Sequence, residues 1–204
     1  MSIEVKICGL TNVEDASFAL DAGADYLGFV TYAPSKRSIT PDALKRLRAE
    51  LPADARCIGV FVNETREHVL NIAESCNLYA VQIHGDEAAT HFTHMPLPVW
   101  RAIAVSRNGF TPDPPQWPAD RYVADAAVPG EYGGTGLPAD WDQASALAQH
   151  VPLMLAGGLT ASNVAAAINH VSPAGVDVAS GVERTPGLKD HSELKAFIHN
   201  AKAG

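Results

Sequence analysis

The chain has few of the features that mark membrane, secreted or nucleic-acid-binding proteins. None of its apolar runs approaches the roughly 18 residues that a membrane helix needs. Its first residues carry charges where a signal peptide needs an unbroken apolar stretch. It has no basic stripe with interleaved aromatic residues, and its formal net charge is -8. We therefore expect a cytoplasmic protein that binds neither membranes nor nucleic acid.

Cysteine is scarce and aromatic residues make up only 7% of the chain. The three cysteines Cys8, Cys57 and Cys76 have no CxxC spacing, which argues against both a disulfide framework and a zinc site. His91 and His94 are spaced closely enough to hold a metal, but no third ligand follows nearby in the sequence, so a solvated helix face is the interpretation we favour. The sequence predicts reduced thiols and no metal.

Hydrophobic residues make up 47% of the 204 residues, which is typical of a globular chain with a full core. No linker or low-complexity tract divides it. We therefore expect residues 1–204 to form a single domain.

Short apolar, β-branched runs alternate with amphipathic segments along most of the chain. Eight such runs are present: EVKICG, DYLGFV, CIGVFV, YAVQIH, VWRAIAV, RYVADA, PLMLAG and GVDVAS. Nearly continuous apolar strands joined by helices favour a parallel sheet, and eight of them in about 200 residues is the lower size limit of a (β/α)8 TIM barrel. The sequence predicts this α/β fold.

Side chains that commonly cap helices mark several of the predicted helix starts. The candidates are Thr11 with Glu14, Thr40 followed by Pro41, Asn63, and Asp190 with Glu193. One connection differs, because four prolines follow Thr111 in the segment SRNGFTPDPPQWPAD. We expect an irregular Pro-rich connection there, between the fifth and sixth strands.

In such a barrel, functional residues lie at the C-terminal ends of the strands and in the loops that follow. The polar residues there are Cys8, Arg37, Asn63, Gln82, His84, Arg101 and Asp125. Each also has an ordinary structural interpretation. Cys8 could be a small buried hydrophobic residue, Asp125 a loop cap and His84 a core histidine.

Glycine-rich segments follow the last two predicted strands. Gly157 and Gly158 precede an expected helix, and Ser180 and Gly181 follow the eighth strand, where barrels frequently bind phosphate through backbone N–H groups. Paired glycines also serve tight turns, so one pair alone is weak evidence. Two such loops on neighbouring strands favour a phosphorylated ligand. A third glycine-rich segment, Gly130 to Gly136, is a candidate lid.

Several motifs occur here in the order found in phosphoribosylanthranilate isomerases, which are phosphate-binding (β/α)8 barrels of tryptophan biosynthesis. The most specific are KICGLT, QIHGDE, GGTG and GVDVASGVE, and the chain resembles that family over nearly its whole length. It departs from the common pattern at Lys36, where proline is usual, and at Ala179, where serine is usual. The second departure removes a hydroxyl beside the expected phosphate site.

The resemblance implies an Amadori-type isomerisation of N-(5'-phosphoribosyl)anthranilate without metal or organic cofactor. It implies Cys8 as general base, Asp125 as general acid and Arg37 as the group that contacts the anthranilate carboxylate. By the same analogy the phosphate would bind at Gly157, Gly158, Ser180 and Gly181. Asp177 would lie near the sugar hydroxyls or the anthranilate amine, and Gln82 and His84 would complete the substrate site.

Other interpretations remain open at the level of sequence. A metal-dependent phosphosugar epimerase would need histidine and aspartate ligands on several strand ends, and a bifunctional isomerase would need a second glycine pair after the third or fourth strand. Neither pattern is present in the sequence. A barrel kept only as a ligand sensor would be expected to lose the acid or the base, yet both residues are there. The acidic, polar composition is compatible with a monomer, and a homodimer stays open.

Overall fold

Eight parallel strands close into a barrel in the computed structural model, which describes residues 3–106, 109–126 and 140–203. The strands are β1 (Glu4–Ile7), β2 (Tyr26–Val30), β3 (Cys57–Phe61), β4 (Ala80–Ile83), β5 (Val99–Ser106), β7 (Arg121–Ala126), β8 (Leu153–Leu155) and β9 (Gly175–Val178). Parallel pairing of β9 with β1 and of β4 with β5 completes the ring. Seven of these strands lie within a predicted run and β5 extends one residue beyond its run, to Ser106. The predicted (β/α)8 barrel is confirmed.

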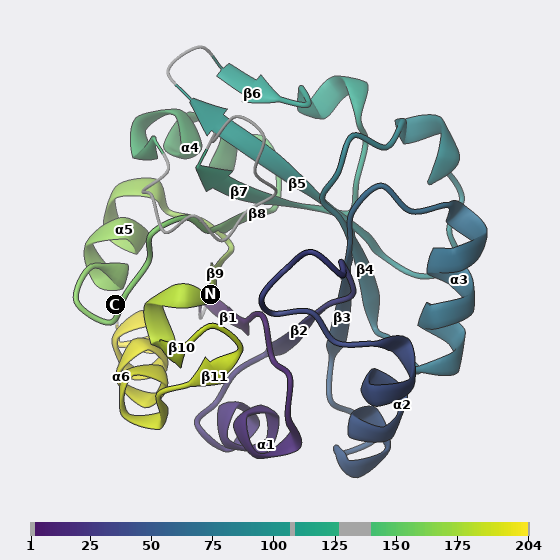
Figure 1. Ribbon diagram of the computed structural model, residues 1–204. Coiled ribbons are helices and arrows are strands. Elements are labelled where there is room, and N and C mark those ends of the chain that lie inside the picture. The colour runs from purple at the N-terminus through teal and green to yellow at the C-terminus, as the bar shows by residue number, and fades with distance from the viewer. Residues whose placement is uncertain (1–2, 107–108, 127–139, 204) are drawn as a thin grey trace.

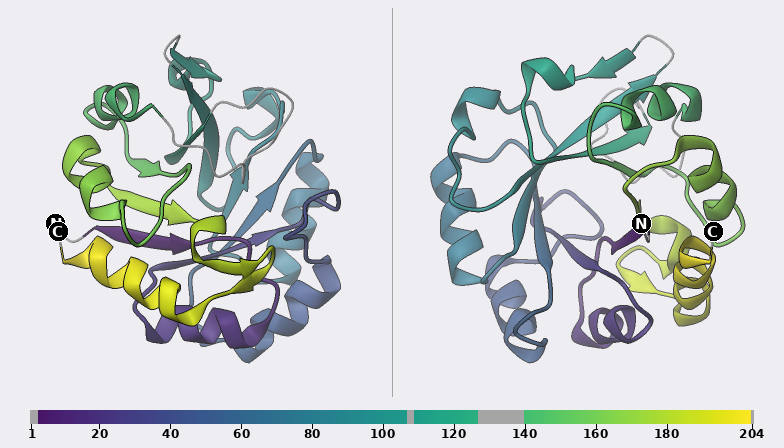
Figure 2. Two further views of the ribbon diagram at one scale, coloured as in Figure 1. Left: turned by 60° about the vertical axis from the view of Figure 1, so that its left-hand side comes forward. Right: turned by 180° about the vertical axis from the view of Figure 1, so that it is seen from behind.

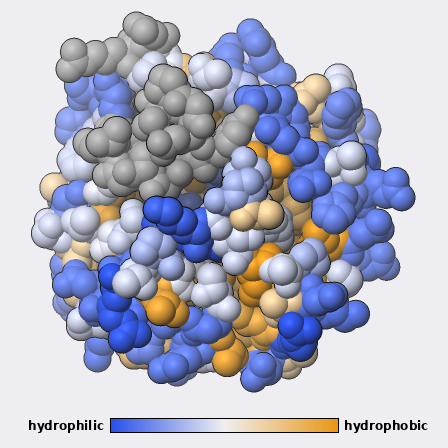
Figure 3. All heavy atoms as spheres, in the orientation of Figure 1, coloured by the Kyte–Doolittle hydropathy of each residue, from blue (hydrophilic) through white to orange (hydrophobic). Residues whose placement is uncertain are grey.

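The described residues form six α-helices. These helices surround the strands on the outside (Figures 1 and 2). They are α1 (Val13–Asp21), α2 (Pro41–Glu50), α3 (Arg66–Ser75), α4 (Trp141–Ala148), α5 (Val164–Val171) and α6 (His191–Lys202). Figure 3 shows hydrophilic residues predominating around the periphery of the molecule, as expected for helices with one face in water. In the described part of the chain no helix is long and apolar enough to cross a membrane.

Two of the connections contain no α-helix among the described residues. Only the 3-10 turn η1 (Ala89–His91) lies between β4 and β5. The Pro-rich connection after β5 holds a short strand, β6 (Gly109–Thr111), which pairs antiparallel with β5, and the 3-10 turn η2 (Pro114–Gln116). The connection is therefore more ordered than the proline content predicts. After β9 the chain forms the turn η3 (Ser180–Val182) and a hairpin of β10 (Glu183–Thr185) and β11 (Leu188–Lys189).

Alternation along each strand separates an outer core from an inner one. On β1, Val5 and Ile7 pack with the helices in the larger hydrophobic cluster. A smaller cluster fills the barrel interior with side chains such as Tyr26, Trp100 and Met154. The two clusters place the barrel between a helical layer outside and a packed centre.

Aromatic and charged side chains pack together around Tyr26 near the N-terminal end of the barrel. Arg121 lies 4.9 Å from the centre of the Trp100 ring and forms an ion pair with Glu4. Glu4 also accepts a hydrogen bond of 2.6 Å from the Tyr26 hydroxyl. Burial and this bond to Glu4 raise the pKa of Tyr26 to about 12, so the phenol stays protonated.

Two of the predicted helix caps are confirmed and two are wrong. Thr40 and Asp190 cap α2 and α6 as expected. The cap of α1 is Asn12, whose side chain accepts from the N–H of Asp15, while the hydroxyl of Thr11 donates to the carbonyl of Gly187 at 2.6 Å.

The cap of α3 also differs from the prediction. Thr65 caps this helix, while Asn63 adopts a left-handed conformation with φ of 56°. The side chain of Asn63 accepts instead from the N–H of Asp86, so it joins the loops after β3 and β4. In both wrong cases the side chain that the local pattern assigned to a helix cap instead forms a hydrogen bond with a loop that is distant in the sequence.

The cap of α1 generates a test of these assignments. Asn12→Ala should lower the free energy of unfolding by about 1 kcal/mol, because the N–H of Asp15 loses its acceptor. Glu14→Ala should change it less, since Glu14 is exposed. Urea unfolding of both variants measures the difference. Equal losses, or a larger loss for Glu14→Ala, would restore Thr11 and Glu14 as the cap.

Candidate active site

One cavity at the C-terminal end of the barrel collects all the residues to which the sequence analysis gave a catalytic, substrate-binding or phosphate-binding role. Its lining includes Cys8, Arg37, Gln82, His84, Asp125, Gly157, Gly158, Asp177, Ser180 and Gly181. These residues come from six of the eight barrel strands or from the loops that follow them. They converge because the C-terminal ends of parallel strands open on the same face of a closed barrel.

Two other candidates at the strand ends have structural contacts instead. The guanidinium of Arg101 donates to the carbonyls of Ile83 and Gly85 and lies 3.4 Å from Glu87. Asn63, as described above, joins two loops. Neither lines the cavity. The candidate lid, residues 130–136, lies outside the described residues.

The loops after β8 and β9 adopt backbone conformations that require glycine. Gly157 and Gly158 have φ of 84° and 62°, in the left-handed region that other residues rarely adopt. A Cβ atom on Gly181 would lie 1.8 Å from the carbonyl oxygen of Leu159, so these two loops touch. The helix after Gly158 starts later than expected, because Asn163 precedes α5 and donates back to the Gly158 carbonyl at 2.9 Å. In both loops the glycines allow the backbone to lie close to a ligand in the cavity.

Cys8 lies at the end of β1 with its thiol on the cavity and 9% of the residue exposed. Its N–H donates to the Val178 carbonyl at 2.8 Å, which ties β1 to β9 beside the cavity. Cys57 and Cys76 are buried and do not line the cavity. Burial raises the pKa of the Cys8 thiol, and the positive charge of Lys6 lowers it. The negative charge of Asp177 raises the pKa further, so the pKa of the thiol lies above its ordinary value.

A lysine that the sequence reasoning missed lies below Cys8 in the barrel interior. Lys6 is fully buried, and its ammonium forms an ion pair of 2.8 Å with the Oδ2 atom of Asp177. Burial lowers the pKa of Lys6, but attraction to Asp177 and Cys8 outweighs it, so the pKa is raised and Lys6 stays charged. The other oxygen of Asp177, Oδ1, is buried without a hydrogen-bond partner among the described residues, although Asp177 lines the cavity.

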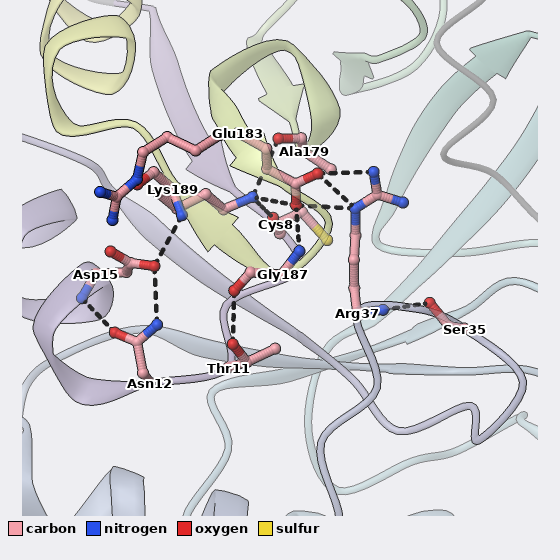
Figure 4. A network of polar contacts seen from close by, with 11 residues as sticks. Cys8, Thr11, Asn12, Asp15, Ser35, Arg37, Ala179, Glu183, Gly187 and Lys189 are labelled. Carbon is pink, nitrogen blue, oxygen red and sulfur yellow. Dashed lines mark hydrogen bonds and ion pairs between the residues drawn. The ribbon is translucent and has the colours of Figure 1, made fainter.

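Arg37 is held at the cavity by a carboxylate that sequence reasoning also missed (Figure 4). Both oxygens of Glu183 accept from Arg37, at 2.8 to 3.1 Å. The stem of Arg37 passes over Gly9, where a Cβ atom would lie 2.6 Å from its Cδ atom. Glu183 therefore fixes the direction of the guanidinium, and Gly9 makes room for it.

Lys189 connects this ion pair to Cys8. Its ammonium donates to the Cys8 carbonyl at 2.6 Å, to the Ala179 carbonyl at 3.1 Å and to Glu183 at 3.1 Å. Figure 4 shows the Lys189 ammonium and Arg37 on opposite sides of the Glu183 carboxylate, with Cys8 next to the ammonium. The motif GVDVASGVE ends in Glu183, but nothing in its position in the sequence predicted these contacts.

Gln82 and His84 line the cavity from β4 and the residue that follows it. The Oε1 atom of Gln82 is buried without a hydrogen-bond partner among the described residues. Burial, together with the positive charges of Arg101 and Lys6, lowers the pKa of His84 to about 4. His84 is therefore neutral at pH 7 and can both donate and accept a hydrogen bond.

Asp125 enters the cavity from the end of β7, three strands away from β1 around the ring. The cavity thus holds a thiol and a carboxyl on well-separated strands, with the glycine loops of β8 and β9 between them. In the described ranges no group of three or more His, Cys, Asp or Glu residues could hold a metal ion.

The comparison with known families fits this geometry. A family model described as N-(5'-phosphoribosyl)anthranilate isomerase matches residues 5–200. The chain belongs to the phosphoribosylanthranilate isomerase family. Members of this family are enzymes of the isomerase class, and the chain is one of them.

Individual relatives support this membership over the full length. The isomerase of Pelobacter propionicus is 44% identical over 200 residues, covering 98% of this chain and 96% of the relative. The isomerase of Geotalea uraniireducens is 42% identical over 199 residues, covering 98% of each. Among solved structures, the phosphoribosylanthranilate isomerase of Thermus thermophilus superimposes with a TM-score of 0.87 at 31% identity, covering 98% of this chain and 99% of that one.

A further solved isomerase of the family is a complex. It contains reduced 1-(o-carboxyphenylamino)-1-deoxyribulose 5-phosphate and superimposes with a TM-score of 0.83 at 37% identity, covering 99% of this chain and all of that one.

Glu183 generates a prediction about stability and pH. Burial raises the pKa of this carboxyl, but hydrogen bonds from Arg37 and attraction to Lys189 outweigh it, so its folded-state pKa lies below the ordinary value of 4.5. A lowered folded-state pKa gives stability that is complete above the unfolded pKa and is lost as pH falls below it. The free energy of unfolding should therefore decline as pH falls from about 5 to 3.

Glu183→Gln should be less stable than wild type at pH 7 and should show a flatter decline between pH 5 and 3. Urea unfolding at several pH values measures both effects. Glu74→Gln, which changes an exposed carboxylate on α3, is the matched control. A decline as steep in Glu183→Gln as in wild type would show that Glu183 is not the source of the pH dependence.

Proposed function

We propose that this chain converts N-(5'-phosphoribosyl)anthranilate to 1-(o-carboxyphenylamino)-1-deoxyribulose 5-phosphate in tryptophan biosynthesis, with Asp125 as general acid and Cys8 as general base. The observation that carries the proposal is a single cavity that contains a thiol, a carboxyl, a fixed arginine and two glycine loops. The substrate has a matching set of groups: an aminoaldose ring, an aromatic carboxylate and a phosphate.

The phosphate is assigned to Gly157, Gly158, Ser180 and Gly181. Gly157 and Gly158 have positive φ, and Gly181 packs closely against the carbonyl of Leu159 in the neighbouring loop after β8. At these positions backbone lies close to the cavity with no side chain in between. Backbone N–H groups at such loops bind anions well. Ala179 stands where a serine is common in the family, so this site relies on Ser180 for its hydroxyl.

The reaction begins with opening of the ribose ring, which requires a proton on the ring oxygen. Asp125, which lines the cavity, donates that proton as the general acid. The resulting iminium acidifies the neighbouring C2–H bond. Cys8, as thiolate, removes the C2 proton to give an enolamine, which tautomerises to the ketone. Cys8 forms no covalent bond to the substrate in this sequence.

Arg37 is assigned to the anthranilate carboxylate. A guanidinium binds a carboxylate through paired N–H donors. The two carboxylate oxygens of Glu183 hold the Arg37 guanidinium in one orientation. Asp177 is assigned to a sugar hydroxyl or the anthranilate amine, because its Oδ1 atom needs a donor that the protein does not supply within the described residues. Gln82, whose Oε1 atom has the same need, and neutral His84 complete the substrate contacts.

Loss of the acid or the base is the decisive test. Cys8→Ser and Asp125→Asn should each lower kcat by about 10²–10⁴-fold, because each variant removes one proton-transfer group. The decay of anthranilate fluorescence with freshly generated phosphoribosylanthranilate measures turnover. Cys76→Ser makes the same thiol-to-hydroxyl change at a buried site outside the cavity and should retain turnover.

No decay with folded wild-type protein would contradict the substrate assignment. Turnover near the wild-type rate in Cys8→Ser or Asp125→Asn would remove that residue from the chemistry.

The role of Arg37 is tested separately. Arg37→Ala should raise KM more than it lowers kcat, since it removes a contact that is equally strong in the ground state and the transition state. Glu183→Gln should change KM in the same direction but less, because it loosens the guanidinium without removing it. Arg46→Ala, an exposed arginine on α2, is the control. An unchanged KM in Arg37→Ala would place the carboxylate elsewhere.

A further inference from the structure

A general base must be deprotonated to act, and the surroundings of Cys8 favour the thiol on balance. Cys8 is nearly buried, and Asp177 places a negative charge nearby. Both effects disfavour a thiolate. Some positive charge must therefore act on the sulfur for the proposed chemistry to run.

Among the described residues, three cations act on the Cys8 sulfur, and two of them are bound to other groups. Arg37 is bound to both oxygens of Glu183. Lys189 is bound to the same carboxylate and to two backbone carbonyls. Glu183 offsets much of both charges. Lys6 is left, and its only carboxylate partner in the described residues is Asp177.

The backbone places Lys6 directly below Cys8. Lys6 lies on β1, and Cys8 follows the last residue of that strand two positions after Lys6, so in extended backbone both side chains point to the same face. Both pack over Gly28 on β2, where a Cβ atom would lie 2.8 Å from the Cys8 sulfur and 3.0 Å from the Lys6 Cε atom. Gly28 thus leaves the space in which the end of the Lys6 side chain approaches the sulfur. Lys6 is fully buried, so its ammonium does not contact solvent.

We propose that Lys6 is the positioning residue that makes Cys8 a base: its ammonium, held below the sulfur by Asp177, stabilises the thiolate. This inference rests on the proposed function. Lys6 keeps its three protons throughout; only the sulfur changes, losing its proton to water and then accepting the proton from C2 of the substrate. Lys6 itself does not act as the base, because attraction to Asp177 and Cys8 keeps it charged.

Asp177 has the opposite influence, and the substrate can weaken it. The carboxylate shares the ammonium with the sulfur and opposes its charge. A substrate hydroxyl or amine that donates to the unpartnered Oδ1 atom would draw part of that negative charge away. Substrate binding would then favour the thiolate at the time when a base is needed.

Other groups that face Cys8 must be held constant in any test. The charged and titratable ones come from several elements: Lys6 on β1, Asp177 on β9, Glu183 on β10, Lys189 on β11, Arg37 after β2, His84 after β4 and Asp125 on β7. Of these groups, only Lys6 and Asp177 are substituted in the test, and the others keep their charges.

The test is the pH dependence of Cys8 alkylation by iodoacetamide in the full-length protein, measured on the Cys8 peptide by mass spectrometry so that Cys57 and Cys76 do not interfere. Lys6→Met should slow alkylation at pH 8 about tenfold, which corresponds to a rise of one pKa unit. Asp177→Asn should accelerate it. Lys202→Met, which removes a partly exposed lysine paired with Asp25, should leave it unchanged.

A second comparison covers the case in which Lys6→Met does not fold because Asp177 has lost its partner. Lys6→Met combined with Asp177→Asn leaves no unpaired charge, and it should be alkylated more slowly than Asp177→Asn alone. In turnover, Lys6→Met should lower kcat and move its pH optimum upwards while KM changes little. A merely structural lysine would move neither pH profile.

Unchanged Cys8 alkylation profiles in both comparisons would overturn the inference, even if wild-type protein turns over phosphoribosylanthranilate. The reverse result is distinguishable. Profiles that shift as expected, in a wild-type protein that does not turn over the substrate, would support the coupling of Lys6 to Cys8 and contradict the proposed function.

Discussion

The ion pair between Lys6 and Asp177 is the constraint on which the C-terminal half of the barrel interior depends. A fully buried ammonium is costly unless a carboxylate faces it, and these two side chains lie 2.8 Å apart on paired strands. Cys8 lies above the pair, and Gly28 leaves room for both the sulfur and the lysine. The packed apolar side chains below, such as Trp100 and Met154, leave this polar layer open towards only one end of the barrel.

A second set of ionic contacts holds the loops around that layer. Lys189 binds the carbonyls of Cys8 and Ala179, so the hairpin after β9 fastens the ends of β1 and β9 together. The same lysine neutralises Glu183, which orients Arg37. The thiol and the guanidinium of the proposed mechanism therefore start from backbone and side chains that are already fixed in place. Such preorganisation reduces the cost of orienting a substrate.

Much of the fold and of the cavity lining could be predicted from the sequence. Apolar β-branched runs located all eight barrel strands, and the closure of parallel strands brought Cys8, Asp125 and the glycine loops to one end of the barrel. Local patterns failed where a distant partner competes for the side chain. Thr11 bonds to Gly187 instead of capping α1, and Asn63 reaches the N–H of Asp86.

The missed residues have the same physical explanation. Lys6 interrupts an apolar strand, where a lysine usually points to solvent, and only its strand partner Asp177 makes burial tolerable. Glu183 lies 146 residues from Arg37 in the sequence, so no spacing rule joins them. Long-range pairs of this kind become visible only when the barrel closes.

A crystal structure of the wild-type protein with reduced 1-(o-carboxyphenylamino)-1-deoxyribulose 5-phosphate tests the central claim most directly. The account predicts the phosphate on the loops after β8 and β9, the ligand carboxylate on Arg37, and a donor on the Oδ1 atom of Asp177. It also predicts C2 within about 3.5 Å of the Cys8 sulfur, as a proton transfer requires. A ligand whose phosphate binds elsewhere, or whose C2 faces away from the sulfur, would contradict the account.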